Sequence, residues 1–181
     1  RGARQLFDAF LLAGVAYMAA AALGNLALLS ELPSLGINVV PLPKQEPLLL
    51  LQLYGFSTMF ILGVSMRVLP GFMGLRSPRQ EALLAAFVLV NVGVVAQATA
   101  GWGAAYGGWD LERLDNWGSL SMVAGLAAFV AGLNVLLPSR ESTPGPQMYK
   151  LLARGAYVWL LVAAGIEAFY AFKATSGGFG A

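Results

Sequence analysis

Two charged residues stand out because they lie inside, or at the end of, long apolar runs. Glu167 is the one acid well inside such a run, about one and a half helical turns before Lys173. A carboxyl group in a bilayer is costly and by default functional, so Glu167 is a candidate for carrying a proton or a cation, or for snorkelling to the surface. Arg67 ends another run, where its guanidinium could anchor the helix at the headgroups or bind an anion or a propionate in a bidentate fork.

A second group of candidates consists of uncharged polar side chains within the apolar runs. They are Asn25, Gln52, Ser57, Thr58, Asn91, Gln97 and Asn134. Such groups are satisfied by partners or water inside a membrane, and two interpretations stay open. They could join helices through hydrogen bonds worth about 0.6 kcal/mol each. Alternatively, Asn91 and Gln97 could work with Glu167 in a small transporter or channel.

The sequence contains no cysteine and no histidine. Disulfides, thiolate metal sites and thiol catalysis are therefore excluded, as are haem, copper or chlorophyll held by the chain's own histidines. The sequence also lacks a phosphate-binding loop, a Ser-His-Asp set and zinc-ligand spacing. We therefore expect no enzymatic activity and no cofactor bound through histidine or cysteine, which leaves lipid, quinone or pigment as molecules that the chain could contact.

The composition is that of a protein solvated by lipid. Of the 181 residues, 58% are hydrophobic and only 11% are charged, and the mean hydropathy is +0.70. An average soluble domain carries about 25% charged residues, so the deficit predicts an integral membrane protein. The net charge of +2 is too small to indicate nucleic-acid binding.

Five apolar runs, each of some 20 residues, predict five membrane spans. They cover about residues 6–29, 48–68, 82–101, 117–137 and 151–172. Because this is the length that a spanning helix needs, we expect an all-α polytopic bundle, with residues 1–181 as a single transmembrane domain. Turn-forming residues separate the runs, so we expect Pro47 to precede the second span and Pro70-Gly71 to end it. We expect Trp102–Asn116 to form a loop at the membrane interface, because it is rich in tryptophan and tyrosine.

The cations divide unevenly between the two sides of a five-span bundle. One side would hold Arg1, Arg4, Arg67, Arg76, Arg79, Arg140, Lys150 and Arg154, and the other Lys44, Arg113 and Lys173. Basic residues favour the cytoplasmic side, so this division predicts a cytoplasmic N-terminus and an outside C-terminus. The expected location is the cytoplasmic (inner) membrane of a bacterium.

Small residues recur at four-residue spacing along three of the runs. They are Ala16, Ala20 and Gly24; Ala124, Ala128 and Gly132; and Ala164 and Ala168. Such stripes let helix backbones approach closely in lipid, where no hydrophobic drive acts between helices. They predict close packing within the bundle, contacts with another membrane subunit, or both.

The second run carries a pattern of glycine, arginine and small apolar residues. The pattern comprises Gly55, Thr58-Met59, Gly63-Val64, Arg67, Gly71, Gly74 and Arg76. It resembles the NnrS family of bacterial membrane proteins, and the likeness continues over residues 87–95 and from Arg154 into the fifth run. The resemblance implies a many-span helical scaffold linked to nitric-oxide metabolism, with haem and copper as cofactors. The family has histidines where this sequence has Leu50 and Phe72, so the scaffold carries over and the metal function does not.

These observations together predict a non-catalytic integral membrane subunit. Its role would be to support the assembly or stability of a larger bacterial respiratory, photosynthetic or nitrogen-oxide redox complex, with membrane lipids and other integral subunits as partners. One alternative is a haem-associated nitric-oxide response protein of NnrS type. The other is a small transporter or channel.

Overall fold

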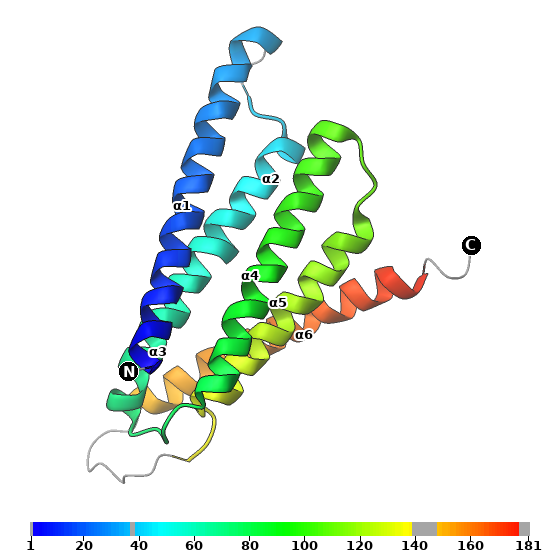
Figure 1. The fold of residues 1–181 in the computed structure, drawn as a ribbon. Helices are drawn as coiled ribbons and strands as arrows, with labels where there is room; N and C mark the ends of the chain where they lie inside the picture. The colour runs from blue at the N-terminus through cyan, green and yellow to red at the C-terminus, as the bar shows by residue number, and fades with distance from the viewer. Residues whose placement is uncertain (1, 37–38, 139–147, 178–181) are drawn as a thin grey trace.

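The computed structural model describes residues 2–36, 39–138 and 148–177, and these ranges contain helices, joined by short turns and loops, and no strands. The elements are α1 (Gly2–Leu35), α2 (Leu42–Leu50), the π-helix η1 (Leu51–Thr58), α3 (Met59–Met73), α4 (Gln80–Trp102), the π-helix η2 (Gly103–Gly107), α5 (Glu112–Leu133) and α6 (Met148–Gly177). Figure 1 shows α1, the continuous α2–η1–α3 segment, α4 and α5 side by side, with α6 crossing them steeply. The predicted all-α class is confirmed for the described part of the chain.

Within the described ranges, five helical segments are long and apolar enough to cross a membrane, as the sequence predicted. They cover Gln5–Pro33, Leu42–Met73, Gln80–Gly107, Glu112–Leu133 and Met148–Lys173. Several of their ends differ from the prediction. The stretch Trp102–Asn116 was expected to be a loop, but α4 and η2 continue to Gly107 and α5 begins at Glu112. The fourth span ends at Leu133, because Asn134 adopts a left-handed conformation with φ 57°.

The second span was predicted to start after Pro47 and to end at Pro70-Gly71, and both expectations are wrong. Pro47 lies within α2 and Pro70 within α3, so the span runs on as one rod. A proline removes its own N–H from the helix, and within a bundle the carbonyl left free can find another partner. The helix ends at Gly74, whose φ of 62° is left-handed. Leu75 then donates its backbone N–H to Pro70 O at 3.1 Å, so the carbonyl of Pro70 itself has a partner at the helix end.

The π-helix η1 widens the middle of the second span. Its hydroxyl side chains bond to carbonyls five residues earlier: Ser57 Oγ donates to Gln52 O at 3.0 Å, and Thr58 Oγ1 to Leu53 O at 3.1 Å. The helix α1 lies very close to this segment, because a Cβ on Gly55 would be only 2.6 Å from Cγ of Tyr17. The glycine therefore allows α1 and η1 to pack at short range.

The closest helix pair, α4 and α5, is built on glycines at seven-residue spacing. Gly118, Gly125 and Gly132 all face α4, and a Cβ on Gly125 would lie 2.7 Å from Cγ2 of Val90. Of the predicted stripe on α5, Gly132 faces α4 and the half-buried Ala128 packs against the core, whereas Ala124 is exposed, so only part of the stripe is used within the bundle. A seven-residue repeat stays on one face over three helical steps, which the four-residue stripe does not.

The other two predicted stripes are also only partly used. On α1, Gly24 packs on Leu48, whereas Ala16 and Ala20 are exposed. On α6, Ala164 is buried and Ala168 half-buried. The stripes therefore contribute single contacts within the bundle instead of continuous seams.

The bundle core is centred on three phenylalanines from three helices. The ring of Phe10 meets that of Phe87 edge to face at 5.1 Å between centroids, and that of Phe129 at 6.0 Å. Phe10 and Phe129 are completely buried. Edge-to-face rings of this kind bring α1, α4 and α5 together and fix their relative rotation.

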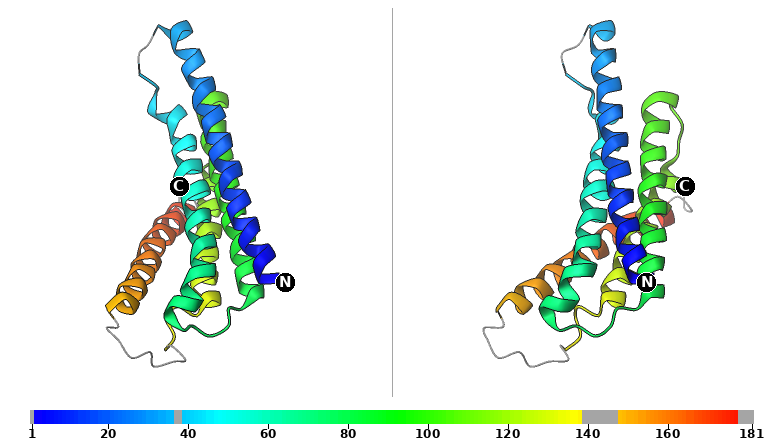
Figure 2. Two further views of the ribbon diagram at one scale, coloured as in Figure 1. Left: turned by 90° about the vertical axis from the view of Figure 1, so that its left-hand side faces the viewer. Right: turned by 60° about the vertical axis from the view of Figure 1, so that its left-hand side comes forward.

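The last helix, α6, packs mainly against α5. Tyr157, Ala164 and Ala171, at seven-residue spacing, form its buried face. Figure 2 shows in two further views that α6 runs obliquely across the direction of the other helices. At its start, Tyr149 Oη donates to Phe72 O at 3.3 Å, which links α6 to the end of α3.

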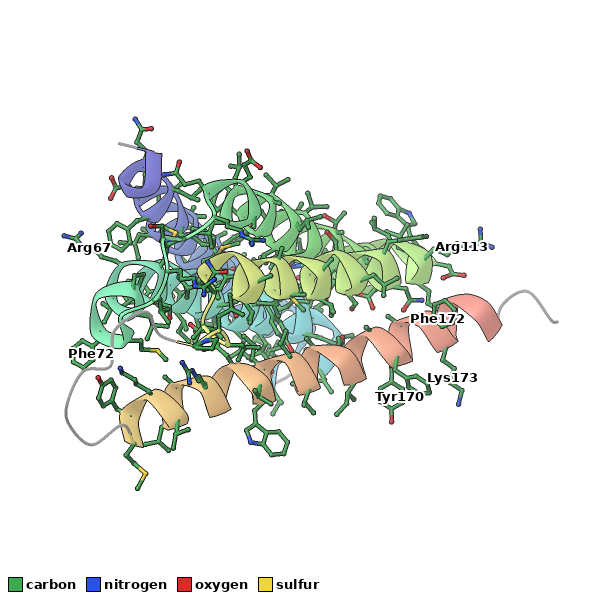
Figure 3. All side chains as sticks on the ribbon, turned by 90° about the horizontal axis from the view of Figure 1, so that it is seen from below. Arg67, Phe72, Arg113, Tyr170, Phe172 and Lys173 are labelled. Carbon is green, nitrogen blue, oxygen red and sulfur yellow. The ribbon has the colours of Figure 1, made fainter. Side chains whose placement is uncertain are left out.

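The cations lie at the helix ends that the sequence assigned to them. Figure 3 shows Arg67 on one side of the view and Arg113 and Lys173 on the other. Arg76 and Arg79 flank the α3–α4 connection, at the same helix ends as Arg67. Arg1 and Arg140, also assigned to that side, fall outside the described residues.

Candidate functional site

A cavity of about 560 Å³ brings together two of the residues that the sequence singled out, Glu167 and Gln97. Its walls come from α2, η1, α4, η2, the connection after η2, α5 and α6. They are formed by Glu46, Pro47, Leu49, Leu50, Leu53, Tyr54, Gln97, Ala100, Gly101, Ala104, Trp109, Asp110, Leu111, Glu112, Asp115, Ser119 and Glu167. Ligand sites in proteins commonly measure about 300–1,000 Å³, so this acid-lined cavity is large enough for a small molecule.

Among the described residues, five carboxylates and no lysine or arginine line this cavity. They are Glu46, Asp110, Glu112, Asp115 and Glu167. The one salt bridge found among the described side chains joins Lys44 to Glu31 at 2.7 Å, and neither residue lines the cavity. None of the five carboxylates therefore pairs with a cation of the described chain, and the cavity carries an excess of negative charge.

The start of α5 explains why three acids gather at one place. Glu112 and Asp115 lie in the first turn of α5, where the helix dipole favours negative charge. Asp110 precedes them and its Oδ1 accepts the backbone N–H of Glu112 at 3.3 Å. The acids are thus stabilised locally by the helix end, without needing neighbouring cations.

The connection between η2 and α5 is shaped by glycines that place Trp109 and Asp110 at the cavity. Gly108 has a left-handed φ of 61°, which reverses the chain after η2. Trp109 then donates its backbone N–H to Gly103 O at 3.2 Å. A Cβ on Gly103 would lie 2.6 Å from Cδ1 of Leu111, so glycine at this position leaves room for the Leu111 side chain where the connection folds back.

Glu167 reaches the cavity from α6 and is tied to α5 there. Ser119 Oγ donates to Glu167 Oε1 at 3.2 Å, and Ser119 is itself buried. This bond spans 48 residues of sequence and links the two helices at the cavity wall. The proposed role of Glu167 in handling a cation is compatible with this position, because its second oxygen has no bond to a described group.

Gln97 lines the same cavity from α4 and is 94% buried, since its exposed fraction is 6%. Its Nε2 is the one buried side-chain nitrogen or oxygen, among the described residues, that has no hydrogen-bond partner. Its stem is held by α5, because a Cβ on Gly118 would lie 2.8 Å from Gln97 Cγ. Buried polar groups are nearly always satisfied, so a ligand or water at Gln97 is indicated.

Two aromatic side chains complete the lining. Tyr54 comes from η1 and Trp109 from the connection before α5. Both are partly exposed, Trp109 at 64% of its surface. Aromatic faces beside carboxylates are the surroundings that organic cations prefer in proteins.

The remaining predicted site residues lie elsewhere. Asn91 accepts a hydrogen bond from Tyr17 Oη at 2.8 Å and donates to Phe87 O at 2.7 Å, which makes it a link between α1 and α4. It does not join Glu167 and Gln97, so the predicted set of three is not brought together. Thr58 bonds to its own helix, and Gln52 is half-buried away from the cavity.

Arg67 is exposed, and its guanidinium carbon lies 5.0 Å from the centroid of the Phe7 ring. This cation–π contact accounts for its position at the end of the bundle. The anion-binding role suggested for Arg67 from sequence stays a prediction.

Sequence reasoning missed most of the cavity's acids, because Asp110, Glu112 and Asp115 were assigned to an interfacial loop. The available signal was the local pattern itself: three acids within six residues, with Arg113 as the only cation among them. Glu46, far away in sequence, gave no such signal.

Comparisons of the sequence with protein-family models, curated proteins and solved structures find no match. The resemblance to the NnrS family therefore stays a prediction. The positions where that family has histidines, Leu50 and Phe72, are 22 residues apart on one continuous span, about 33 Å at 1.5 Å per residue. Leu50 lines the cavity, whereas the exposed Phe72 ring meets Tyr149 at 5.9 Å between centroids.

Proposed function

We propose that this chain is a non-catalytic subunit of the bacterial inner membrane, which supports the assembly or stability of a larger redox complex. The observation that carries the proposal is the packing of α6, which rests mainly on α5. Its other faces carry large exposed side chains, among them Trp159 at 72% and Phe169 at 63% of their surface. A helix of this kind has room for neighbouring helices on several sides.

The glycines of α6 strengthen the proposal. A Cβ added to Gly155 or Gly165 would meet nothing within 4 Å. Inside a bundle, glycines are used where backbones approach closely, as Gly125 shows on α5. The open glycines on α6 are available for the same kind of contact with a helix of another subunit, and lipid is the competing occupant.

Purification of the native complex in mild detergent tests this role. We expect Gly165→Trp to abolish the co-purification of other membrane subunits while the helical circular dichroism of the chain is unchanged. The matched control is Val92→Trp, a substitution at an exposed position on α4, which should leave co-purification intact. Equal recovery of partner subunits with both variants would contradict the proposal that α6 contacts another subunit.

We also propose a cytoplasmic N-terminus and an outside C-terminus, supported by the gathering of Arg67, Arg76 and Arg79 at one set of helix ends. Because the chain lacks cysteine, single cysteines can report each side. Val39→Cys should react with an impermeant maleimide on intact spheroplasts, and Ser77→Cys only after lysis. The reverse pattern would invert the orientation.

A small transporter or channel for a cation is the second candidate, because Glu167 and Gln97 meet at the acid-lined cavity. In proteoliposomes we expect Glu167→Gln to abolish cation flux. The control Glu81→Gln removes an exposed acid at the start of α4, away from the cavity, and should leave flux unchanged. Equal flux from both variants would exclude a transport role for Glu167.

A further inference from the structure

We propose that the acid-lined cavity binds an organic ammonium ion that also carries a hydrogen-bond acceptor, as an amino alcohol does. The proposal is independent of the subunit role, because binding is a property of the isolated chain. If the chain is a transporter or channel, this proposal rests on that role and names the class of cation that it carries. Three features of the lining carry it: the charge, the aromatic walls and the unpaired amide of Gln97.

The charge of the lining favours a cation as the ligand. Five carboxylates face the cavity, no lysine or arginine is among the lining residues, and none of the five is in a salt bridge with a described side chain. Carboxylates around one cavity repel one another and repel anions, and a bound cation relieves that repulsion. An anionic ligand is therefore excluded by the same residues.

The arrangement of the acids favours an organic cation over a metal ion. Within the described ranges, no three acidic side chains come close enough together to hold a metal. The negative charge is instead spread around a cavity of about 560 Å³ that also has leucine walls, such as Leu49 and Leu53. A spread charge with apolar and aromatic surfaces suits an ammonium group on a hydrocarbon body, with Tyr54 and Trp109 as the cation–π partners.

Gln97 adds a requirement that the acids do not. Its Nε2 is buried and has no acceptor among the described groups, although the side chain lines the cavity. A carboxylate-bound ammonium offers only donors, which cannot satisfy this N–H. Nε2 has almost no surface open to the cavity, so a turn of the Gln97 amide must present it to a ligand oxygen close to the ammonium. The cation stays with the carboxylates, and the acceptor and the charge are then recognised together.

The test uses the full chain in nanodiscs of phosphatidylcholine, with phenylalaninol as the probe. Two analogues of the probe separate the contributions of its two recognised groups. One has a methyl group in place of the hydroxyl and keeps the ammonium, and the other has a methyl group in place of the ammonium and keeps the hydroxyl. Calorimetric titration should rank phenylalaninol first, the analogue without the hydroxyl about tenfold weaker, and the analogue without the ammonium at the level of lipid partitioning.

Variants then assign the binding to this cavity. Glu167→Gln and Asp115→Asn should each lower the affinity for phenylalaninol about tenfold. Glu167→Asp should keep most of the affinity of the parent chain, and Glu81→Gln should leave the affinity unchanged. Gln97→Met should abolish the preference for phenylalaninol over its hydroxyl-free analogue while keeping the affinity for that analogue. Helical circular dichroism of each variant in the nanodisc shows that it is folded.

Several outcomes overturn the proposal. Equal binding of all three compounds means partitioning into lipid, and loss of affinity in Glu81→Gln means a general charge effect. An unchanged preference in Gln97→Met assigns the unpaired amide to water and removes the acceptor from the proposal. Each of these results leaves the co-purification of partners through α6 untouched, so failure here is distinguishable from failure of the subunit role.

Discussion

Adding a single methyl group at Gly125 is predicted to separate the best-packed helix pair. In Gly125→Ala the new Cβ would lie 2.7 Å from Val90 Cγ2, 2.9 Å from Val90 N and 3.1 Å from Ala86 O. Two of these three atoms are backbone atoms, which cannot rotate out of the way. Ordinary contacts begin near 3.5 Å, so α4 and α5 must move apart by several tenths of an ångström.

The expected size of the effect follows from what overpacked cores lose. Inserting a methyl group into a tightly packed contact typically costs about 1–3 kcal/mol. Replacing glycine by alanine in a helix gains up to about 1 kcal/mol in intrinsic propensity, which opposes that loss. We expect a net destabilisation of about 1–2 kcal/mol, a change of roughly five- to thirtyfold in the unfolding equilibrium.

The same substitution at Gly165 is the matched control, because a Cβ there would meet nothing within 4 Å. Gly165→Ala should therefore show only the gain in propensity and be as stable as the parent chain or slightly more stable. Reversible unfolding in mixed micelles with increasing SDS, followed by circular dichroism, measures both variants. If Gly125→Ala is as stable as Gly165→Ala, the close approach of α4 and α5 is wrong.

Three further predictions concern single contacts of the fold. Tyr17→Phe removes the 2.8 Å bond to Asn91 and should destabilise the chain by about 0.6 kcal/mol in the same unfolding assay, whereas no loss would mean that the bond does not form. Gly74→Ala places a Cβ on a residue with φ 62° and should cost about 1–2 kcal/mol, so a neutral result would argue against the left-handed end of α3. Ser119→Ala should loosen α6 at the cavity, and faster amide hydrogen exchange around Glu167 than in the parent chain measures this.

The sequence determined the helical class and the five helices long and apolar enough to cross a membrane, because the hydrocarbon core of a bilayer needs about 20 apolar residues in each span. It did not determine where the second span ends. Proline and glycine at Pro70-Gly71 are strong breakers in water, yet the helix passes through both and ends at Gly74. Inside a helical bundle a missing backbone bond is tolerated, and only a left-handed residue with a bonded carbonyl ends the helix.

The sequence predicted that helices pack closely at small residues, but not which small residues make the contacts. The sequence shows that small residues are frequent, and the structure selects Gly118, Gly125 and Gly132 over the predicted stripe that ends at Gly132. Which small residues meet a neighbour depends on the rotation of each helix about its own axis. That rotation is set by contacts with residues far away in sequence, such as the edge-to-face rings of Phe10 and Phe129.

Part of the candidate site was also predictable from the sequence, and part was decided by the tertiary structure. From the sequence alone, the absence of histidine and cysteine limited the chemistry, and Glu167 and Gln97 stood out as polar residues in apolar runs. Tertiary structure decided that these two meet at one cavity with Glu46 and the acids at the start of α5, whereas Asn91 bonds to Tyr17 instead. Composition and the length of apolar runs are properties of the linear sequence. A cavity exists only where several helices cross, and packing between segments that are distant in sequence decides how they cross.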